Sequence, residues 1–371
     1  TRDLFIQGES QAGVVLEAGA EDMFTLQQPD GTTEPVRLFL NDLTLDTTGT
    51  GVHLQSDTEA NLTRVTCVEA NPCALASDIF GLFPVAGGTL TLRDSLLTGS
   101  GAGNGLKILG GGHLIQNTTI ENYDNGIDAL VAGFQILGGA FTGNARGLQL
   151  EGTLDGSRVQ VRDATFDDNG VGIFADDVPL TLNQVEITNS GTYGLDLLGD
   201  RESDLTDVTV TGSGNAGIRA SGPLISVQGG AFNGNTFGLM IGSSTAVIER
   251  IEASGNSLTG LVIYGEANVT LRDSELRNND RYNLNVRESP NGVDLGVPGD
   301  PGGNGPLAIS KTPALRDWFC STWSNPWAIA RRMRTSETAV LGSETLIRMY
   351  PTSSRPSVSY SSMVPASASS R

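Results

Sequence analysis

Apolar residues recur along this chain in a fixed relation to glycine. From Gly105 to Gly260, a glycine followed by an apolar residue, any residue and usually a second apolar residue returns every 21 to 25 residues. A recurrence of this length marks one structural unit repeated in tandem. Copies begin at Gly51, Gly81, Gly105, Gly126, Gly147, Gly172, Gly194, Gly217, Gly238 and Gly260, and Asn283 takes the place of the glycine in a last copy.

A second pattern lies between these glycines, where an apolar residue is followed by another five positions later, as in Leu40/Leu45 and Ile136/Phe141. Side chains of a straight strand alternate between two faces, so a spacing of five predicts a bend between the pair. The bend position is mostly Asp, Asn or Gly, which tolerate a left-handed backbone. These residues are Asp42, Arg64, Asp94, Asn117, Gly138, Asp163, Gln184, Asp207, Gly229, Arg250 and Asp273.

Each repeat therefore predicts a strand, a corner, a second strand, a Gly/Asn-rich loop and a third strand led by the glycine. Three short strands cannot bury an apolar face alone, but coils stacked roughly 4.8 Å apart form a continuous core. The predicted fold class is all-β, a parallel β-helix (solenoid) of about 10–11 coils over residues 36–289. The repeats carry Thr, Val, Ile, Gly and Asn, which argues against a helical solenoid.

Two segments show the repeat most completely, TLRDSLLTGSGAGNGLKIL within residues 89–109 and NVTLRDSELRNNDRYNLNV at residues 268–286. In these features the chain resembles the pectate-lyase-like superfamily of right-handed parallel β-helices over roughly residues 36–289. The resemblance implies a right-handed coil. It leaves the activity open, because the superfamily includes polysaccharide lyases, hydrolases, epimerases and non-catalytic surface proteins.

The two ends differ from the repeat. Residues 1–35 are interpreted as the entry coil of a domain that extends further in the N-terminal direction. Residues 290–310 are rich in Pro and Gly and predict an exit loop. Residues 311–371 contain all three tryptophans of the chain and only one of its 48 glycines. This change in composition predicts either a disordered tail or a frame-shifted sequence.

Charge and cysteine content limit the partners and the compartment. The formal net charge of −19 argues against nucleic acid and anionic membranes as partners. No apolar run approaches the ~20 residues of a membrane-spanning helix. Cys67 and Cys73 are interpreted either as a small disulfide loop of a secreted protein or as a core residue and a free thiol. We expect an extracellular or cell-envelope protein of bacterial origin; the sequence predicts no oligomeric state.

Catalytic motifs of the related enzymes are absent, namely the NTD, DD and GHG set of polygalacturonases and the DPHE motif of alginate epimerases. In such folds, the outward side chains of the strand after the Gly/Asn loop line a groove for glycans. Tyr193 lies in a loop beside this groove. The predicted groove column is His53, Phe83, Lys107, Asp128, Gln149, Phe174, Asp196, Arg219, Met240, Val262 and Asn285.

One hypothesis is β-elimination or C5-epimerisation of a uronic acid polymer. Lys107 or Tyr123 would remove the proton beside the carboxylate, and Arg146 would neutralise the developing enolate. A calcium ion held by Asp124 and Asp128 could take the place of Arg146; no other cofactor is predicted. The competing interpretation is that these residues form cross-strand pairs on a solvated sheet.

The binding hypothesis assigns substrate contacts to another part of the column. Aromatic side chains there would stack on sugar rings, and the polar ones would bond to hydroxyl groups. The predicted binding residues are Phe83, Gln149, Phe174, Asp196 and Arg219. The sequence thus favours a polysaccharide-binding or surface-structural protein. The alternatives are the lyase or epimerase and a ligand-free adhesin or spacer.

Overall fold

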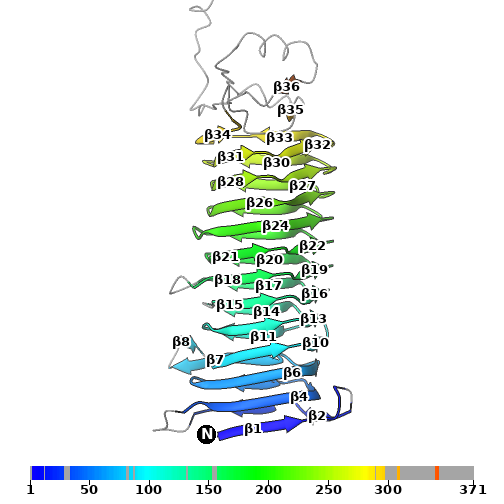
Figure 1. The fold of residues 1–371 in the computed structure, drawn as a ribbon, viewed down its shortest axis with the longest axis vertical. Coiled ribbons are helices and arrows are strands. Elements are labelled where there is room, and N and C mark those ends of the chain that lie inside the picture. The colour runs from blue at the N-terminus through cyan, green and yellow to red at the C-terminus, as the bar shows by residue number, and fades with distance from the viewer. Residues whose placement is uncertain are drawn as a thin grey trace, which may run out of the picture.

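The computed structural model is a single stack of β-coils along one axis (Figure 1). The described residues contain no helix, and the solenoid has about ten turns. The predicted all-β parallel β-helix is therefore confirmed. The backbone alone is described at residues 2, 77–80, 83–86, 307–309 and 339–341. The structure describes residues 2–11, 13–28, 34–80, 83–86, 88–130, 133–152, 157–288, 290–296, 307–309 and 339–341.

The first face of the solenoid consists of strands that run up to the predicted corner. Each strand pairs in parallel with its equivalent in the next coil, as Ile115 does with Ile136. Some strands are long enough to continue through the corner, and the part of each that precedes the corner belongs to the first face. Its strands are β1 (Arg2–Gln7), β9 (Thr89–Arg93), β12 (His113–Gln116), β15 (Phe134–Leu137), β18 (Val159–Arg162), β21 (Leu180–Asn183), β28 (Thr245–Glu249), β31 (Asn268–Arg272) and β34 (Gly292–Asp294).

The second face follows the corner and belongs to the same 21-stranded sheet. Four strands span both faces: β4 (Val36–Thr47), β6 (Thr58–Val68), β24 (Ser203–Thr211) and β26 (Leu224–Asn233). The others are β2 (Val15–Ala18), β10 (Leu96–Thr98), β13 (Thr119–Glu121), β16 (Ala140–Thr142), β19 (Thr165–Asp167), β22 (Glu186–Thr188), β29 (Glu252–Ser254) and β32 (Glu275–Arg277).

The third face is a separate 13-stranded sheet, whose strands follow the Gly/Asn-rich loops. Twelve of them pair in parallel, and β8 (Phe83–Ala86) pairs antiparallel with β7. The parallel strands are β3 (Phe24–Leu26), β5 (Val52–Leu54), β7 (Ala74–Phe80), β11 (Asn104–Leu109), β14 (Asn125–Leu130), β17 (Arg146–Glu151), β20 (Val171–Asp176), β23 (Tyr193–Leu198), β25 (Ala216–Ser221), β27 (Phe237–Gly242), β30 (Thr259–Tyr264) and β33 (Tyr282–Val286).

The predicted corners are confirmed at every position. Each of the eleven bend residues has a positive φ, from 47° at Asn117 to 72° at Gly229. This conformation turns the chain so that both members of an apolar pair point inward, and Ile136 and Phe141 are fully buried. Arg64, Gln184 and Arg250 adopt it without the local advantages of Asp, Asn or Gly. The repeat therefore imposes the bend even where the residue does not favour it.

Aliphatic side chains of successive coils form files inside the tube. Ile136, Val161 and Leu182 occupy equivalent positions in adjacent strands, and all three are buried. Burial of such side chains stabilises the fold by roughly 25 cal/mol per Å² of apolar surface. The core consequently runs along the whole stack instead of forming a compact centre.

The recurring glycines are required by the stacking distance between coils. A Cβ atom on Gly172 would lie 2.6 Å from the carbonyl oxygen of Gly194, and one on Gly147 would lie 2.5 Å from that of Gly172. Both contacts are with backbone atoms, which cannot move aside. A Cβ atom at either position would therefore push two coils apart.

Buried asparagines line the turn between the second and third faces. The Asn256 carboxamide accepts the amide hydrogen of Asn235 and donates to the carbonyl of Phe232. Asn144 and Asn169 repeat the same arrangement one coil apart. These bonds satisfy backbone groups that lie too deep to reach water.

The chain ends are placed as follows. Strands β1, β2 and β3 form a complete coil on β4 and β5. Strands β35 (Leu307–Ile309) and β36 (Ala339–Leu341) pair antiparallel. Apart from the backbone of β36, the predicted tail of residues 311–371 lies outside the described residues.

Candidate functional site

The outward column of the third face has the predicted order over most of its length. Strand β11 places Lys107 beside Asp128 of β14, and β23 places Asp196 beside Arg219 of β25. Regular parallel pairing produces this register, because one residue per coil occupies each position. The column is Lys107, Asp128, Gln149, Phe174, Asp196, Arg219, Met240, Val262 and Asn285.

The placement of Phe83 in this column is wrong. Leu75 lies between His53 and Lys107, because β7 pairs with β5 and β11. Phe83 belongs to β8, which folds back antiparallel on β7. Gly81, the supposed start of this repeat, lies outside the described residues, and Cys73 takes the position of the glycine. An inserted hairpin thus imitates the repeat in sequence.

Lys107 and Asp128 form an ion pair on the surface of the third face. The Lys107 Nζ atom lies 3.6 Å from Asp128 Oδ2, and both side chains are partly exposed. Burial raises the pKa of Asp128, and the positive charge of Lys107 opposes that change. A pair of this exposure contributes about 0–1 kcal/mol to stability. The Lys107 and Asp128 side chains are close enough for both to contact the same bound ligand.

Tyr123 does not lie in the groove, and its predicted role as a base there is wrong. Its side chain is 1% exposed and packs in the core, while its backbone amide donates to Asn144 Oδ1. Burial raises the pKa of the phenol well above its ordinary value. Tyr123 occupies the position that asparagine has in later coils. The sequence shows only that Tyr123 lies in a Gly/Asn-rich loop and not that its side chain points inward.

Among the described residues, no third His, Cys, Asp or Glu side chain joins the two predicted calcium ligands, Asp124 and Asp128. Asp124 is exposed at the start of the third face, and Asp128 faces Lys107. Within the described residues, no group of three or more His, Cys, Asp or Glu side chains is arranged to hold a metal. Calcium binding stays a prediction.

Arg146 and Phe174 approach each other across adjacent coils. The Arg146 guanidinium carbon lies 5.7 Å from the centroid of the Phe174 ring, a cation–π distance. Gln149, which precedes Phe174 in the column, is 8% exposed and donates its amide to Glu151 Oε1. The Arg146 guanidinium therefore lies over an aromatic ring, and its contact is with Phe174 of the next coil.

Asp196 and Arg219 form the most organised contact on this face. Arg219 donates from Nε and Nη2 to the two carboxylate oxygens of Asp196, each at 2.6 Å. Its guanidinium also lies 4.4 Å from the centroid of Tyr193 and donates to that hydroxyl at 3.2 Å. Burial lowers the pKa of Arg219, but the bonds and charge of Asp196 outweigh it and raise the pKa overall. The two bonds to Asp196 and the contact with Tyr193 therefore hold the Arg219 guanidinium in one orientation.

Two residues near this pair were not predicted. Tyr264 lies outward in β30, and its ring covers the position where Gly242 has no side chain. Asn215 donates to the Tyr193 hydroxyl. Alternation identifies Tyr264, since it follows the column residue Val262 by two positions. We use the name third-face site for Phe174, Tyr193, Asp196, Arg219 and Tyr264.

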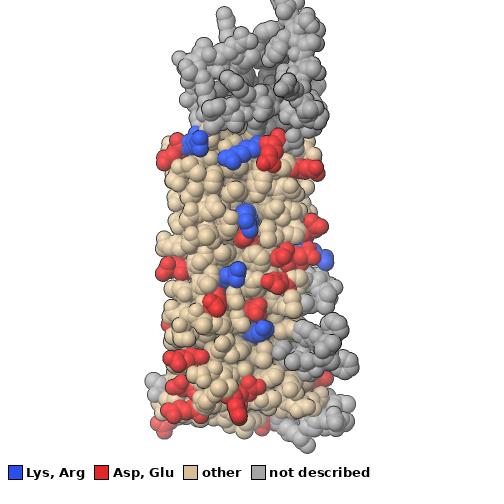
Figure 2. All heavy atoms as spheres, turned by 180° about the vertical axis from the view of Figure 1, so that it is seen from behind, with Lys and Arg blue, Asp and Glu red and all other residues tan. Residues whose placement is uncertain are grey.

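The surface carries little concentrated positive charge. Figure 2 shows the side of the molecule behind that of Figure 1, where Lys and Arg side chains form separate spots with acidic side chains among them. This distribution agrees with the net charge of −19. In the part of the chain that the structure describes, no helix has the length and apolar character needed to cross a membrane.

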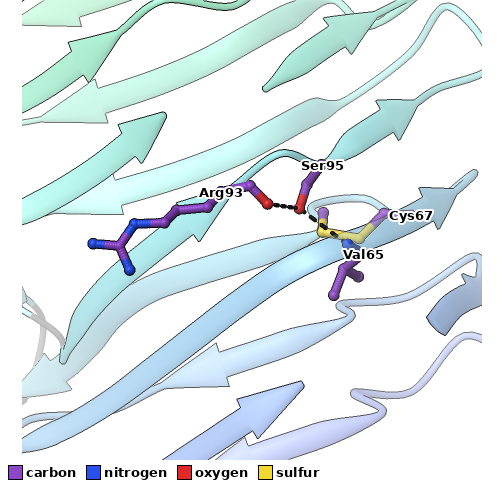
Figure 3. Close-up of a disulfide and its surroundings, with 5 residues drawn as sticks. Val65, Cys67, Arg93 and Ser95 are labelled. Carbon is purple, nitrogen blue, oxygen red and sulfur yellow. Dashed lines mark hydrogen bonds between the residues drawn. A yellow bond between two sulfur atoms is a disulfide. The ribbon is translucent and has the colours of Figure 1, made fainter. Parts of the chain in front are cut away.

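A buried disulfide joins Cys67 and Cys73 beside the third face (Figure 3). The disulfide interpretation of these two cysteines is confirmed, and both are fully buried. Beside it, Ser95 Oγ accepts the amide hydrogen of Val65 and donates to the carbonyl of Arg93. Disulfides persist in oxidising compartments, so this bond is typical of a protein outside the cytoplasm.

Comparison with known proteins agrees with this architecture. Residues 152–295 match the family model for the right handed beta helix region, which confirms the predicted handedness. No curated protein matches the sequence. The molecule is thus a right-handed parallel β-helix.

Three solved structures illustrate the likeness. The catalytic unit of a GH87 α-1,3-glucanase from Streptomyces thermodiastaticus has a TM-score of 0.50 at 11% identity, covering 82% of this chain and 65% of that chain. The periplasmic alginate epimerase AlgG has a TM-score of 0.48 at 12% identity, covering 70% and 75%. The Streptococcus pneumoniae surface protein and adhesin PfbA has a TM-score of 0.36 at 10% identity, covering 70% and 88%. At these identities the likeness shows the fold alone.

Proposed function

We propose that this protein binds polysaccharide through the third-face site, in the extracellular space or the cell envelope of a bacterium. The observation that carries the proposal is the bidentate Arg219–Asp196 pair held over the ring of Tyr193. Such a group offers donors and acceptors in one orientation without having to be ordered by the ligand. Binding to a preorganised surface loses less conformational entropy.

Aromatic rings on neighbouring coils support the same proposal. Phe174, Tyr193 and Tyr264 are each partly exposed in β20, β23 and β30. Aromatic side chains supply apolar contact area for the faces of sugar rings, and tyrosine adds a hydroxyl at the edge. From Phe174 to Tyr264 the rings cover several coils at roughly 4.8 Å each, the length of a short oligosaccharide.

The test is binding to a glycan array, followed by titration of the best ligand with variants. We expect Phe174→Ala to weaken binding at least tenfold without altering the circular dichroism spectrum. Phe5→Ala is the matched control, because Phe5 is 65% exposed at the far end of the solenoid. It should bind as the parent protein does. Absence of binding to every glycan on the array would contradict the proposal and favour a ligand-free spacer or adhesin.

A second candidate is elimination or epimerisation of a uronic acid polymer at Lys107 and Asp128. The Lys107–Asp128 pair and the raised pKa of Asp128 favour it. It has less support than binding, because Tyr123 is buried and Arg146 faces an aromatic ring. Incubation with alginate and pectate, with and without calcium, tests it through the absorbance of unsaturated uronate. An NMR assay of the polymer product tests epimerisation.

A further inference from the structure

We propose that the third-face site selects uncharged sugar chains and discriminates against polyuronates. This inference rests on the proposed function and specifies the ligand class. A site for a polyuronate needs positive groups that are available to carboxylates, whereas a site for a neutral chain needs aromatic faces and paired polar groups. The charges around the third-face site distinguish these two possibilities.

The strongest cation of the site is already occupied by a protein carboxylate. Arg219 directs two of its donors to Asp196 and a third to the Tyr193 hydroxyl. Asp196 is 4% exposed, so a ligand carboxylate cannot displace it without leaving a buried charge unpaired. Three of the five N–H donors of Arg219 are therefore already engaged, and its charge faces a protein carboxylate.

Two further cations of the third face, Lys107 and Arg146, also have contacts within the protein. Lys107 pairs with Asp128, and Arg146 lies over the ring of Phe174. Glu151 and Asp176 stand next to each other at the outward ends of β17 and β20, and both are exposed. Neither acid has an ion-pair partner among the described residues. A polyuronate laid over Phe174 would therefore approach two carboxylates against the single guanidinium of Arg146, which is a net negative surface.

The experiment measures the affinity of the full chain for hexamers of matched length. Neutral hexamers of glucose, mannose and galactose in several linkages are compared with hexamers of galacturonate, guluronate and mannuronate by calorimetric titration at low and physiological salt. We expect a neutral hexamer to bind at least tenfold more tightly than any uronate hexamer. Its affinity should not change with salt, because no net charge is brought together.

A charge-removing variant provides a second readout. Glu151→Gln with Asp176→Asn should raise the affinity for the uronate hexamers about fivefold and leave the neutral affinity unchanged. Glu17→Gln with Glu186→Gln removes the same charge from exposed positions on the second face and should change neither affinity. This control separates a local effect from the effect of net charge.

The outcomes separate this inference from the proposed function. Preferential binding of a uronate hexamer, with an affinity that falls as salt rises, would overturn the inference and leave polysaccharide binding intact. An unchanged uronate affinity in the Glu151→Gln/Asp176→Asn variant would also overturn it. Failure to bind any hexamer, together with an empty glycan array, would overturn the proposed function itself.

Discussion

The N-terminal coils at residues 34–130 and the C-terminal coils at residues 133–288 have the same backbone fold, but different residue types occupy some equivalent positions. In the C-terminal coils, a glycine leads the third strand in every coil up to β30, and asparagine or serine occupies the buried turn position. In the N-terminal coils, Cys73 replaces a glycine, Tyr123 replaces an asparagine and His113 enters a core file. A hairpin is also inserted after β7.

This difference shows which features of a coil can be exchanged. Stacking requires a small residue where backbones meet and a partner for each buried backbone group. Repeated glycine and asparagine meet both requirements with local bonds. Where they are missing, the N-terminal coils have a disulfide-bonded cysteine or a large ring, and elsewhere in these coils the His113 imidazole accepts a buried backbone amide hydrogen. We therefore expect the N-terminal coils to respond to pH and to reduction, and the C-terminal coils to respond to changes in side-chain size.

The largest expected effect is acid destabilisation through His113. Its ring lies between Leu90 and Phe134 in the core, and Nδ1 accepts the amide hydrogen of Leu90 at 3.1 Å. Burial lowers the pKa of His113 from 6.5 to about 4. Between these pH values the unfolded chain binds a proton that the folded chain excludes, so stability falls as pH falls. The loss is about 3 kcal/mol and should level off below pH 4.

Urea unfolding at a series of pH values measures this contribution. The matched variant is His113→Asn, whose side-chain oxygen can replace Nδ1 as an acceptor but does not titrate. Its stability should change less between pH 6.5 and pH 4 than that of the parent protein. Carboxylates with lowered pKa values, such as Asp42 at about 2, contribute below this window. Equal pH dependence in both proteins would show that His113 is not the titrating group.

The next effect concerns the disulfide. Cys67 and Cys73 enclose a short loop, six positions apart in sequence, and both are buried. Closing a loop of this length stabilises a protein by about 2–3 kcal/mol in the chain-entropy model. Cys67→Ala with Cys73→Ala should therefore lower the free energy of unfolding by that amount. The reducing agent dithiothreitol should destabilise the parent protein but not the variant. A variant as stable as the oxidised parent would contradict the covalent role assigned here.

A smaller effect is expected from Gly172→Ala in the C-terminal coils. The added Cβ would lie 2.6 Å from the Gly194 carbonyl oxygen and 2.7 Å from Ile187 Cγ2. Relief of such a clash costs about 1–3 kcal/mol, to be measured by thermal and urea unfolding. Gly19→Ala is the control, because no atom lies within 4 Å of its added Cβ. Similar losses in both variants would mean that the coils do not limit side-chain size at Gly172.

Periodicity determined how much of this molecule the sequence could predict. The corners and core files follow from residue types repeated in every coil, so Asp163 and Val161 were assigned correctly. Phe83 was misplaced because the segment after Gly81 imitates the glycine pattern, and only strand pairing distinguishes an insertion from a coil. Tyr123 was misplaced because a loop position does not reveal whether a side chain turns inward.

The candidate site was harder to predict than the coil. Register follows from the repeat, so the adjacency of Asp196 and Arg219 could be expected. The bidentate geometry depends on side-chain rotamers, which no spacing encodes. The prediction covered a single outward file and therefore did not include Tyr264, although alternation along β30 places it on the same face. Burial of Gln149 by its neighbours likewise depends on side chains from several coils.

The smallest expected effect is a gain in stability at a break in the asparagine file. Ser190 and Ser213 occupy two successive turn positions, and neither buried hydroxyl has a hydrogen-bond partner among the residues that the structure describes. By analogy with the bonds that Asn256 makes, Ser190→Asn would accept the amide hydrogen of Asn169 and donate to the carbonyl of Phe166. Each new buried bond contributes about 0.5–1.5 kcal/mol, so the free energy of unfolding should rise by about 1 kcal/mol.

Two further variants decide whether the gain comes from the file itself. Ser213→Asn in addition to Ser190→Asn would make the file continuous from Asn144 to Asn279, and its effect should exceed that of the single change. Ser257→Asn lies on an exposed loop position and should change stability by less than about 0.5 kcal/mol. Slower amide exchange at Asn169 in the Ser190→Asn variant would identify the new bond. If Ser190→Asn is destabilising, serine is required there by packing, and the regularity of the C-terminal coils does not extend through these two positions.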